Sequence, residues 1–215
     1  MTTIRTAGLV LAGGHGRRMA AQGPGRPTTS TGQGIDKPLL TVGGRTMLAA
    51  VIAALDLPHI AISANGDPAR FATFGVPVLS DGEFQDQGPL AGVLAGLDWA
   101  ASLGMTALLT APGDTPFLPH GLADRLSPPP CCASSAGRRH HLVALWPVEC
   151  RTELRALLSA PGPRDVAGFA ERIGMRHVAF AVRPLDPFVN VNTRDDLARV
   201  RQQAGDVNGS ESVET

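Results

Sequence analysis

The stretch AGLVLAGGHGRRM, residues 7–19, carries a short apolar run directly into a glycine-rich turn that ends in two arginines. The run Ala7–Leu11 predicts a buried strand, because strands covered on both faces are continuous apolar segments of about this length. The glycines that follow permit unusual dihedral angles and let backbone amides approach a phosphate chain. The turn is therefore a candidate phosphate-binding loop, although glycine-rich turns after a first strand also occur without function. It matches neither the Walker pattern GxxxxGK[ST] nor GxGxxG, whose third glycine is replaced by Met19.

Strand-like and helix-like segments alternate along the rest of the chain. This alternation predicts an α/β fold, a three-layer α/β/α sandwich with a Rossmann-like, mainly parallel sheet. Ligands of such sheets bind beyond the carboxyl ends of the strands. The predicted strands are Ala7–Leu11, His59–Ser63, Val76–Leu79, Ala107–Thr110, Leu142–Trp146 and His177–Val182, and the predicted helices are Thr46–Leu55, Leu90–Leu103, Pro119–Leu126, Glu149–Ser159, Val166–Ile173 and Thr193–Gln202.

The length of 215 residues, 43% of them hydrophobic, is enough for one domain with a sizeable core. We expect this domain to span residues 1–203. Two stretches rich in Gly, Pro, Ser and Thr interrupt the alternation, and they predict a mobile loop at 20–35 and a linker loop at 127–137. Residues 204–215 predict a disordered tail.

Composition also excludes several classes of protein. The longest apolar stretch, Met47–Leu57, is about half of a membrane span, and the N-terminus lacks the apolar core of a signal peptide, so a soluble cytoplasmic protein without a membrane partner is expected. A net charge of zero gives no electrostatic reason to expect nucleic acid. The three cysteines predict reduced thiols. A zinc site built on the adjacent Cys131 and Cys132 with two nearby histidines is disfavoured, because adjacent ligands have poor tetrahedral geometry.

Charge is unevenly distributed along the chain. Residues 1–45 hold six basic residues against one acidic residue, whereas residues 46–120 hold one against seven. The positive segment predicts an anionic ligand near the start of the chain. Lys37 is the one lysine among 19 basic residues, which suggests that a compact, flexible ammonium is needed at that position.

Eight short motifs, spread over most of the chain, resemble those of nucleotidyltransferases that activate sugars and cofactors. Within that group the pattern is most similar to the molybdenum cofactor guanylyltransferases. Several ordered motifs are far more specific than one glycine-rich loop. The motifs are LAGG at 11–14, RRM at 17–19, DKPLL at 36–40, SAN at 63–65, LSD at 79–81, GPLAG at 88–92, PGDTP at 112–116 and FVNVNT at 188–193.

The resemblance implies a nucleotide-diphospho-sugar transferase type of fold and a Mg²⁺-dependent reaction. GMP would be transferred from GTP to the terminal phosphate of molybdopterin carrying molybdenum (Mo-molybdopterin), forming the guanine dinucleotide cofactor and pyrophosphate. Transient contact with proteins that deliver the cofactor, or with molybdoenzymes, is also implied. A CTP-dependent cytidylyltransferase, a sugar-1-phosphate-activating enzyme and a nucleotide-binding regulatory protein without turnover are the alternatives. The two glycines of LAGG favour GTP, because the CTP-dependent relatives tend to show LAAG.

The resemblance also implies roles for individual residues. Attack on an α-phosphorus needs charge neutralisation and in-line positioning. Arg18 and Lys37 would neutralise the triphosphate, and Asp114 would hold Mg²⁺ as a hard oxygen ligand. The residues expected at the nucleotide are Leu11, Ala12, Gly13, Gly14, Lys37, Ser63, Asn65, Asp81, Gly88, Pro89, Leu90, Gly92 and Asp114, and those expected at molybdopterin are Asn190, Asn192 and His141.

Structural roles compete with some of these assignments. Asp114 would alternatively be the N-cap of a helix near Pro116, and Asp81 a loop aspartate in a turn with Gly82. Two features depart from the family pattern. Ser63 stands where the guanylyltransferases often have Asn, so Asn65 would take part of that role. The connection from Arg18 to Lys37 is longer than expected by about a dozen residues.

Overall fold

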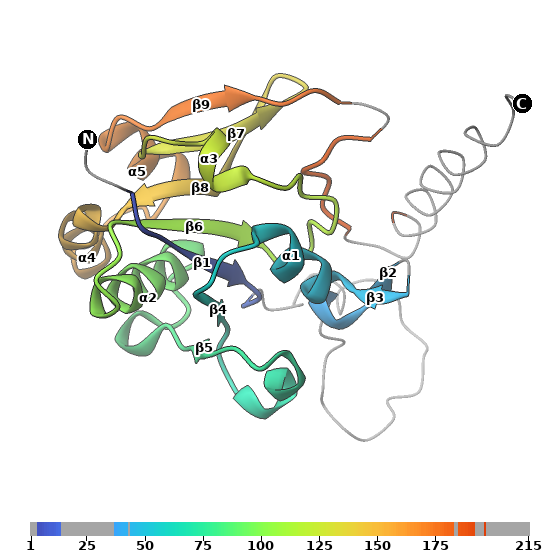
Figure 1. Ribbon diagram of the computed structural model, residues 1–215. Helices are drawn as coiled ribbons and strands as arrows, with labels where there is room; N and C mark the ends of the chain where they lie inside the picture. The colour runs from blue at the N-terminus through green and yellow to red at the C-terminus, as the bar shows by residue number, and fades with distance from the viewer. Residues whose placement is uncertain (1–3, 14–36, 43, 183–184, 192–195, 197–215) are drawn as a thin grey trace, which may run out of the picture.

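A computed structural model describes residues 4–13, 37–42, 44–182, 185–191 and 196. Its main sheet has seven strands in the order β5-β4-β1-β6-β8-β7-β9, and β2 and β3 form a separate hairpin (Figure 1). The strands are β1 Thr6–Leu11, β2 Thr41–Val42, β3 Arg45–Thr46, β4 Ile60–Ser63, β5 Val78–Leu79, β6 Ala107–Pro112, β7 Cys131–Ser135, β8 Arg138–Pro147 and β9 Arg176–Ala179. The helices are α1 Met47–Leu55, α2 Pro89–Ser102, α3 Leu122–Arg125, α4 Arg151–Ser159 and α5 Val166–Arg172, with short 3-10 turns η2 Lys37–Leu39, η3 Pro68–Phe74, η4 Gly82–Phe84 and η5 Val148–Cys150.

The sheet is mainly parallel, as the alternation of segments predicts. Strands β5, β4, β1 and β6 pair in parallel, and so do β7 and β9. Strand β8 is antiparallel to both of its neighbours, β6 and β7. The carboxyl ends of the four strands from β5 to β6 therefore lie along one edge, which is where ligands of such sheets bind.

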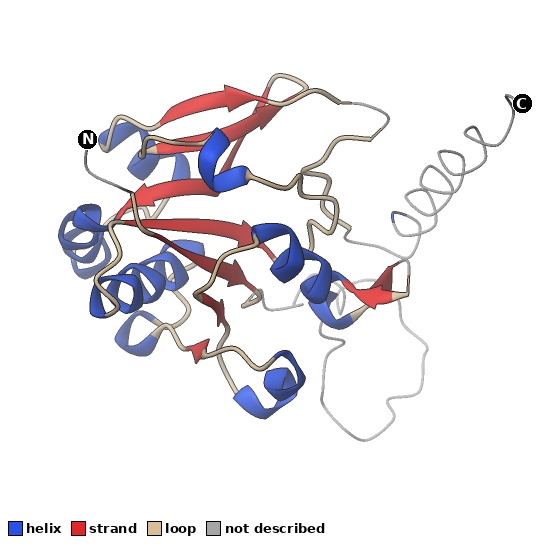
Figure 2. Ribbon diagram, viewed as in Figure 1, coloured by secondary structure: helices blue, strands red, loops and turns tan. Residues whose placement is uncertain are grey.

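Helices cover both faces of the sheet (Figure 2). Buried side chains of α1 and α3 pack on one face, with Val10 and Ile62 of the strands. Those of α2, α4 and α5 pack on the other face, with Leu9 and Trp146. Neighbouring residues of a strand point to opposite faces, so a continuous apolar strand supplies both cores. The three-layer architecture expected from the sequence is therefore confirmed.

The linker loop expected at 127–137 is wrong for its second half. Cys131–Ser135 form β7, a strand buried along its whole length between β8 and β9. Small Cys, Ala and Ser side chains next to three prolines gave a loop-like composition, but pairing on both sides stabilises the strand without large side chains. Ala136 and Gly137 form a two-residue turn with φ of 45° and 76°, which joins β7 to β8.

Several boundaries also differ from those predicted. Helix α3 has four residues, Leu122–Arg125, where a helix from 119 to 126 was expected, because Gly121 in the left-handed region precedes it. Strand β8 begins four residues earlier than predicted. The helix expected at 193–202, the loop at 20–35 and the tail at 204–215 lie outside the described residues, apart from position 196. Within the described residues, no helix is long and apolar enough to cross a membrane.

Helix α2 approaches the sheet closely because of two glycines one turn apart. A Cβ at Gly96 would lie 2.5 Å from Leu9 Cδ2 and 2.9 Å from Leu108 Cδ2. A Cβ at Gly92 would lie 2.3 Å from Ser63 Oγ. The helix starts at Pro89, whose fixed φ suits the first helical position. Its N-terminus is thereby brought to the carboxyl edge of β1 and β4.

Candidate active site

A pocket of about 270 Å³ opens at the carboxyl edge of the parallel strands. The chain after each strand contributes to it in turn, from β5, β4, β1 and β6, and the N-terminus of α2 closes one side. Its lining consists of Leu11, Ala12, Gly13, Pro38, Ser63, Asp81, Gly88, Pro89, Gly92, Pro112, Asp114, Leu142 and Asn190. Residues up to 179 positions apart in the sequence therefore share one cavity, as the rule for α/β sheets predicts.

Most of the residues expected at a nucleotide line this pocket. Three lining residues were not predicted individually. Pro38 and Pro112 flank predicted residues inside the DKPLL and PGDTP motifs, which was the available signal. Leu142 gave no such signal, because it read as the start of an apolar strand.

Some predicted residues do not line the pocket. Leu90 is fully buried in the core under α2, so its role there is packing. Asn65 lies behind Asp81 and bonds to it. His141 is on β8 next to the lining residue Leu142, and burial lowers the pKa of its imidazole. Neither Asn65 nor His141 is part of the pocket wall.

Other predicted residues are not placed. Gly14, Arg18 and Asn192 lie outside the described residues. Lys37 is described through its backbone, at the start of η2 and next to the lining residue Pro38. A Cβ at Gly113 would lie 3.3 Å from Pro38 Cβ, so η2 packs closely on the loop after β6.

Asp81 presents an unpaired oxygen at one end of the pocket. Its Oδ2 accepts from Asn65 Nδ2 at 2.7 Å, and its backbone N–H donates to Asn65 Oδ1 at 3.0 Å. Its Oδ1 is buried without a hydrogen-bond partner. The Ser63 hydroxyl nearby favours the ionised form, but its geometry falls short of a hydrogen bond to that oxygen.

The environment of Asp81 makes its charge costly. Burial raises the pKa of its carboxyl, the hydrogen bond from Asn65 opposes that rise, and the negative charge of Asp86 adds to it. A ligand that donates N–H groups to Oδ1 would favour the ionised form and supply the missing hydrogen bond. Although Asp81 precedes η4, its side chain makes no capping hydrogen bond there. The turn itself therefore does not account for this side chain.

Asp114 lies near the middle of the strand edge, after β6. Its backbone oxygen accepts from Val191 N at 2.9 Å, and Thr115 Oγ1 donates to Pro112 O at 2.7 Å, which fixes the turn. The alternative that Asp114 caps a helix near Pro116 is wrong, because the next helix begins at Leu122 with Gly121 as its N-cap. A carboxylate in this position can hold Mg²⁺ together with phosphate oxygens, since Mg²⁺ is commonly bound by one or two carboxylates and the substrate.

Leu142 and Asn190 form the opposite end of the pocket from Asp81. Strand order places β5, with Asp81 after it, at one end and β8, with Leu142, at the other. Strand β8 shifts its register against β7 between Cys132 and Ala133, close to this point. Asp114 therefore lies between two ends of different composition.

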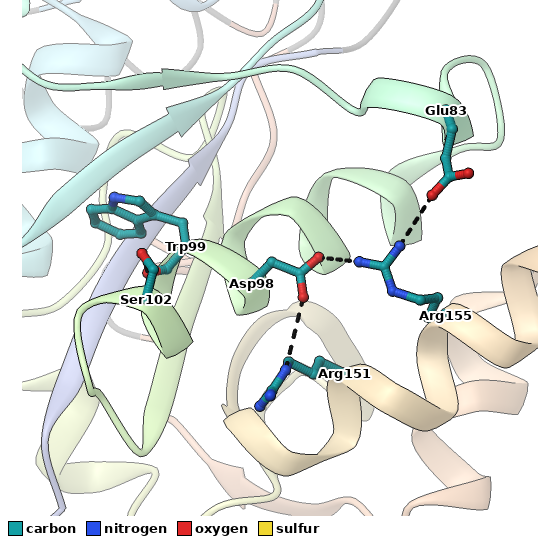
Figure 3. A network of polar contacts seen from close by, with 6 residues as sticks. All are labelled: Glu83, Asp98, Trp99, Ser102, Arg151 and Arg155. Atoms are coloured by element: carbon teal, nitrogen blue, oxygen red, sulfur yellow. Dashed lines mark hydrogen bonds and ion pairs between the residues drawn. The ribbon is translucent and has the colours of Figure 1, made fainter.

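A polar network ties the turn after Asp81 to two helices (Figure 3). Arg155 of α4 pairs with Glu83 of η4 at 3.1 Å and also pairs with Asp98 of α2, which lies 3.9 Å from Arg151. The guanidinium of Arg155 also lies 5.7 Å from the centre of the Phe84 ring. These side chains are exposed, so each pair stabilises the fold by roughly 0.2–1 kcal/mol. Their consequence for the site is positional, because η4 directly follows Asp81.

The cysteines and histidines considered for zinc do not form such a site. Cys131 packs in the core under α1 and α3, whereas Cys132 packs in the core under α2, α4 and α5. The two thiols therefore point to opposite faces of the sheet. Burial raises the pKa of Cys132 to about 11, which keeps it in the protonated form that binds metals poorly. No group of three or more His, Cys, Asp or Glu side chains is placed to hold a metal ion within the part of the chain that the structure describes.

Comparison with known proteins gives consistent results. Residues 8–175 match the MobA-like NTP transferase domain. The chain is 53% identical over 191 residues to a molybdenum cofactor guanylyltransferase of Acidiphilium cryptum, with 88% of this chain and 90% of the relative covered. It is 46% identical over 202 residues to one of Cereibacter sphaeroides, with 91% and 95% covered.

Solved structures share the fold at lower identity. Molybdopterin-guanine dinucleotide biosynthesis protein A of Archaeoglobus fulgidus matches with a TM-score of 0.63 and 20% identity, over 93% of this chain and 99% of that one. A nucleotidyl transferase of Methanothermobacter matches with a TM-score of 0.66 and 19% identity, over 95% and 99%.

Proposed function

Because this chain belongs to the MobA-like NTP transferase family, we propose that it transfers GMP from GTP to Mo-molybdopterin, forming the guanine dinucleotide cofactor and releasing pyrophosphate. The observation that carries this proposal is the pocket that joins Asp81, Asp114 and Asn190 along one strand edge. Nucleotidyl transfer needs a nucleoside site, a charge-neutralising centre and an acceptor site, in that order. The three residues supply one group for each.

The Asp81 end fits a guanine base. Guanine has N–H donors at N1 and N2 on one edge, whereas cytosine and adenine have one amino donor each next to a ring acceptor. The buried Oδ1 of Asp81 lacks a donor, so a base that supplies one gains a charge-assisted hydrogen bond. This supports GTP over CTP. The backbone at 11–13 would hold the nucleoside or its phosphates.

The centre of the pocket fits the reacting phosphate. A bound Mg²⁺ would supply charge neutralisation for the phosphate oxygens, and Asp114 is the residue that would hold it. Lys37 and Arg18 are proposed to neutralise the remaining charge of the triphosphate. In-line attack requires the acceptor phosphate to approach from the side opposite to the leaving pyrophosphate. Asn190 and Leu142 are proposed to line that approach, with Asn192 and His141 as further predicted contacts. The cytoplasmic location and contacts with protein partners stay predictions.

The test is pyrophosphate release from purified protein with Mg²⁺ and Mo-molybdopterin. We expect release with GTP, little release with CTP or ATP, and a guanine dinucleotide product by mass spectrometry. Asp114→Asn keeps the size of the side chain but weakens metal binding, so it should lower turnover by roughly 10²–10³-fold while keeping the thermal midpoint. Release with CTP in preference to GTP, or near-normal turnover of Asp114→Asn, would contradict the proposal.

A further inference from the structure

Ser135 joins two distant parts of the chain at the end of β7. Its side chain is buried, with 3% of the residue exposed. Its Oγ lies 2.7 Å from His140 Nε2 on β8 and 2.8 and 2.9 Å from the two carboxylate oxygens of Asp186. One hydroxyl therefore connects the β7–β8 hairpin to the segment 185–191, which is 51 positions away in the sequence.

The direction of these hydrogen bonds follows from the groups present. A carboxylate only accepts, so the Ser135 hydroxyl donates its proton to Asp186. The lone pairs of Oγ then accept from His140, which carries its hydrogen on Nε2. This order, with Ser between His and Asp, differs from that of an activated nucleophile, in which the hydroxyl gives its proton to His. The buried Ser135 thus has a structural task.

The same carboxylate organises the turn that follows it. Asp186 Oδ1 also accepts from Phe188 N at 2.9 Å, and the backbone oxygen of Asp186 accepts from Val189 N at 3.2 Å. The Phe188 ring is 2% exposed and lies 4.8 Å from the ring of His140 and 5.0 Å from that of Phe180, between centres. The segment is therefore fixed to the hairpin by polar and aromatic contacts at once.

Asn190 lies between this anchor and a second one. Two residues before it, Phe188 is held as described, and directly after it Val191 N donates to Asp114 O at 2.9 Å. Asn190 itself lines the pocket at the end opposite to Asp81. Its position relative to Asp114 thus depends on both anchors.

We propose that Ser135, His140 and Asp186 form a positioning relay that holds Asn190 in place for the acceptor substrate. The relay acts through Asn190 and does not touch the nucleotide end of the pocket, whose lining comes from other elements. The inference rests on the proposed function in one respect, the identity of the acceptor as Mo-molybdopterin. The placement of the segment by the relay is independent of that identity.

The variant Ser135→Ala tests the relay, and Ser134→Ala is its matched control. Ser134 is the preceding residue of β7, is also buried, and donates to Val178 O of β9 at 3.2 Å, away from segment 185–191. Both changes remove one buried hydroxyl and one or two hydrogen bonds. In Ser135→Ala we expect the KM for the acceptor to rise roughly tenfold and the KM for GTP to stay within about twofold. Ser134→Ala should leave both KM values unchanged, even if it lowers stability equally.

A conservative variant and a measurement without substrates complete the test. Asp186→Asn keeps an acceptor oxygen for Phe188 N or Ser135, so its acceptor KM should lie between those of wild type and Ser135→Ala. Hydrogen exchange at the amides of Phe188 and Val191 should quicken in Ser135→Ala and not in Ser134→Ala. Equal exchange or equal acceptor KM in the two serine variants would overturn the relay. Absence of GTP-dependent turnover in wild type would overturn the proposed function, and the exchange measurement would still decide on the relay.

Discussion

At the scale of single residues, the pocket depends on side chains that are only partly satisfied by the protein. Asp81 has one oxygen bonded to Asn65 and one buried oxygen without a donor. Leaving a buried acceptor unpaired typically costs about 1–3 kcal/mol, and a ligand that pairs it recovers that free energy. Specificity therefore arises from the protein's own unmet hydrogen bond, which a base with the wrong pattern leaves unmet.

The change Asp81→Asn tests this interpretation of base recognition. Asn65 Nδ2 needs an oxygen at the Oδ2 position, so the new amide nitrogen would take the Oδ1 position and present donors to the pocket. We expect kcat/KM for GTP to fall roughly 10- to 100-fold, from the loss of about 1.4–3 kcal/mol. XTP, which has a carbonyl where guanine has its 2-amino group, should improve relative to GTP. Pyrophosphate release with both nucleotides measures the ratio, and an unchanged GTP value would remove Asp81 from base recognition.

At the scale of elements, α2 serves both the core and the site. Gly96 lets the helix pack against Leu9 and Leu108 of the central strands, and Gly92 does the same against Ser63 at the pocket. The polar network of Arg155 holds η4 against the other side of this helix. The helix therefore has a fixed distance from the sheet, and the pocket width depends on that distance.

Two alanine substitutions on α2 should separate these tasks. At Gly96 the added methyl would clash with buried leucines, which costs about 1–3 kcal/mol, and the better helix propensity of alanine offsets about 1 kcal/mol of that. Gly96→Ala should thus lower the free energy of unfolding by up to about 2 kcal/mol in urea titrations, with little change in the KM for GTP. Gly92→Ala should displace the Ser63 hydroxyl and raise the KM for GTP several-fold, with a smaller loss of stability. The reverse pattern would show that Gly92 belongs to the core and Gly96 to the site.

At the scale of the whole molecule, one strand edge separates the two substrates. The parallel strands β5, β4, β1 and β6 provide the base and phosphate positions, and the reversed strand β8 with segment 185–191 provides the other end. The second end includes two adjacent histidines. Burial lowers the pKa of His140, against the opposing charge of Asp186 and with the aid of Arg138 and His141. Burial lowers the pKa of His141 too, with the aid of Arg139 and against the charges of Asp165 and Glu171.

The lowered pKa values predict a loss of stability in mild acid. The unfolded chain binds protons at these histidines more strongly than the folded chain, so folding is penalised as the pH falls below the ordinary value of 6.5. The raised pKa of Asp81 has the opposite sign, but its effect belongs to the more acidic range near 3.8. We expect a lower urea midpoint at about pH 5.5 than at about pH 7.5. His141→Gln, which leaves the relay intact, should reduce this difference, and a wild-type midpoint independent of pH would contradict the argument.

The sequence by itself determined the sandwich and most of the nucleotide end of the pocket. Alternating strand and helix patterns are local, and parallel strands place their carboxyl ends on one edge whatever their order. Motifs that directly follow strands, such as those ending in Asp81 and Asp114, could therefore be assigned to one pocket without coordinates. Where a composition imitates a loop, as at 131–135, this reasoning failed, because the strand is stabilised by its neighbours and not by its own side chains.

Only the tertiary structure decided which partner each polar group has. Asn65 reads as a nucleotide contact in its motif but bonds to Asp81, 16 positions away. Ser135 and Asp186, which read as parts of loops, meet across 51 positions. The reversed β8, with its shifted register, brings Leu142 to the pocket. Such contacts depend on strand pairing and register between distant segments, and the local periodicity that predicts helices and strands carries no information about them.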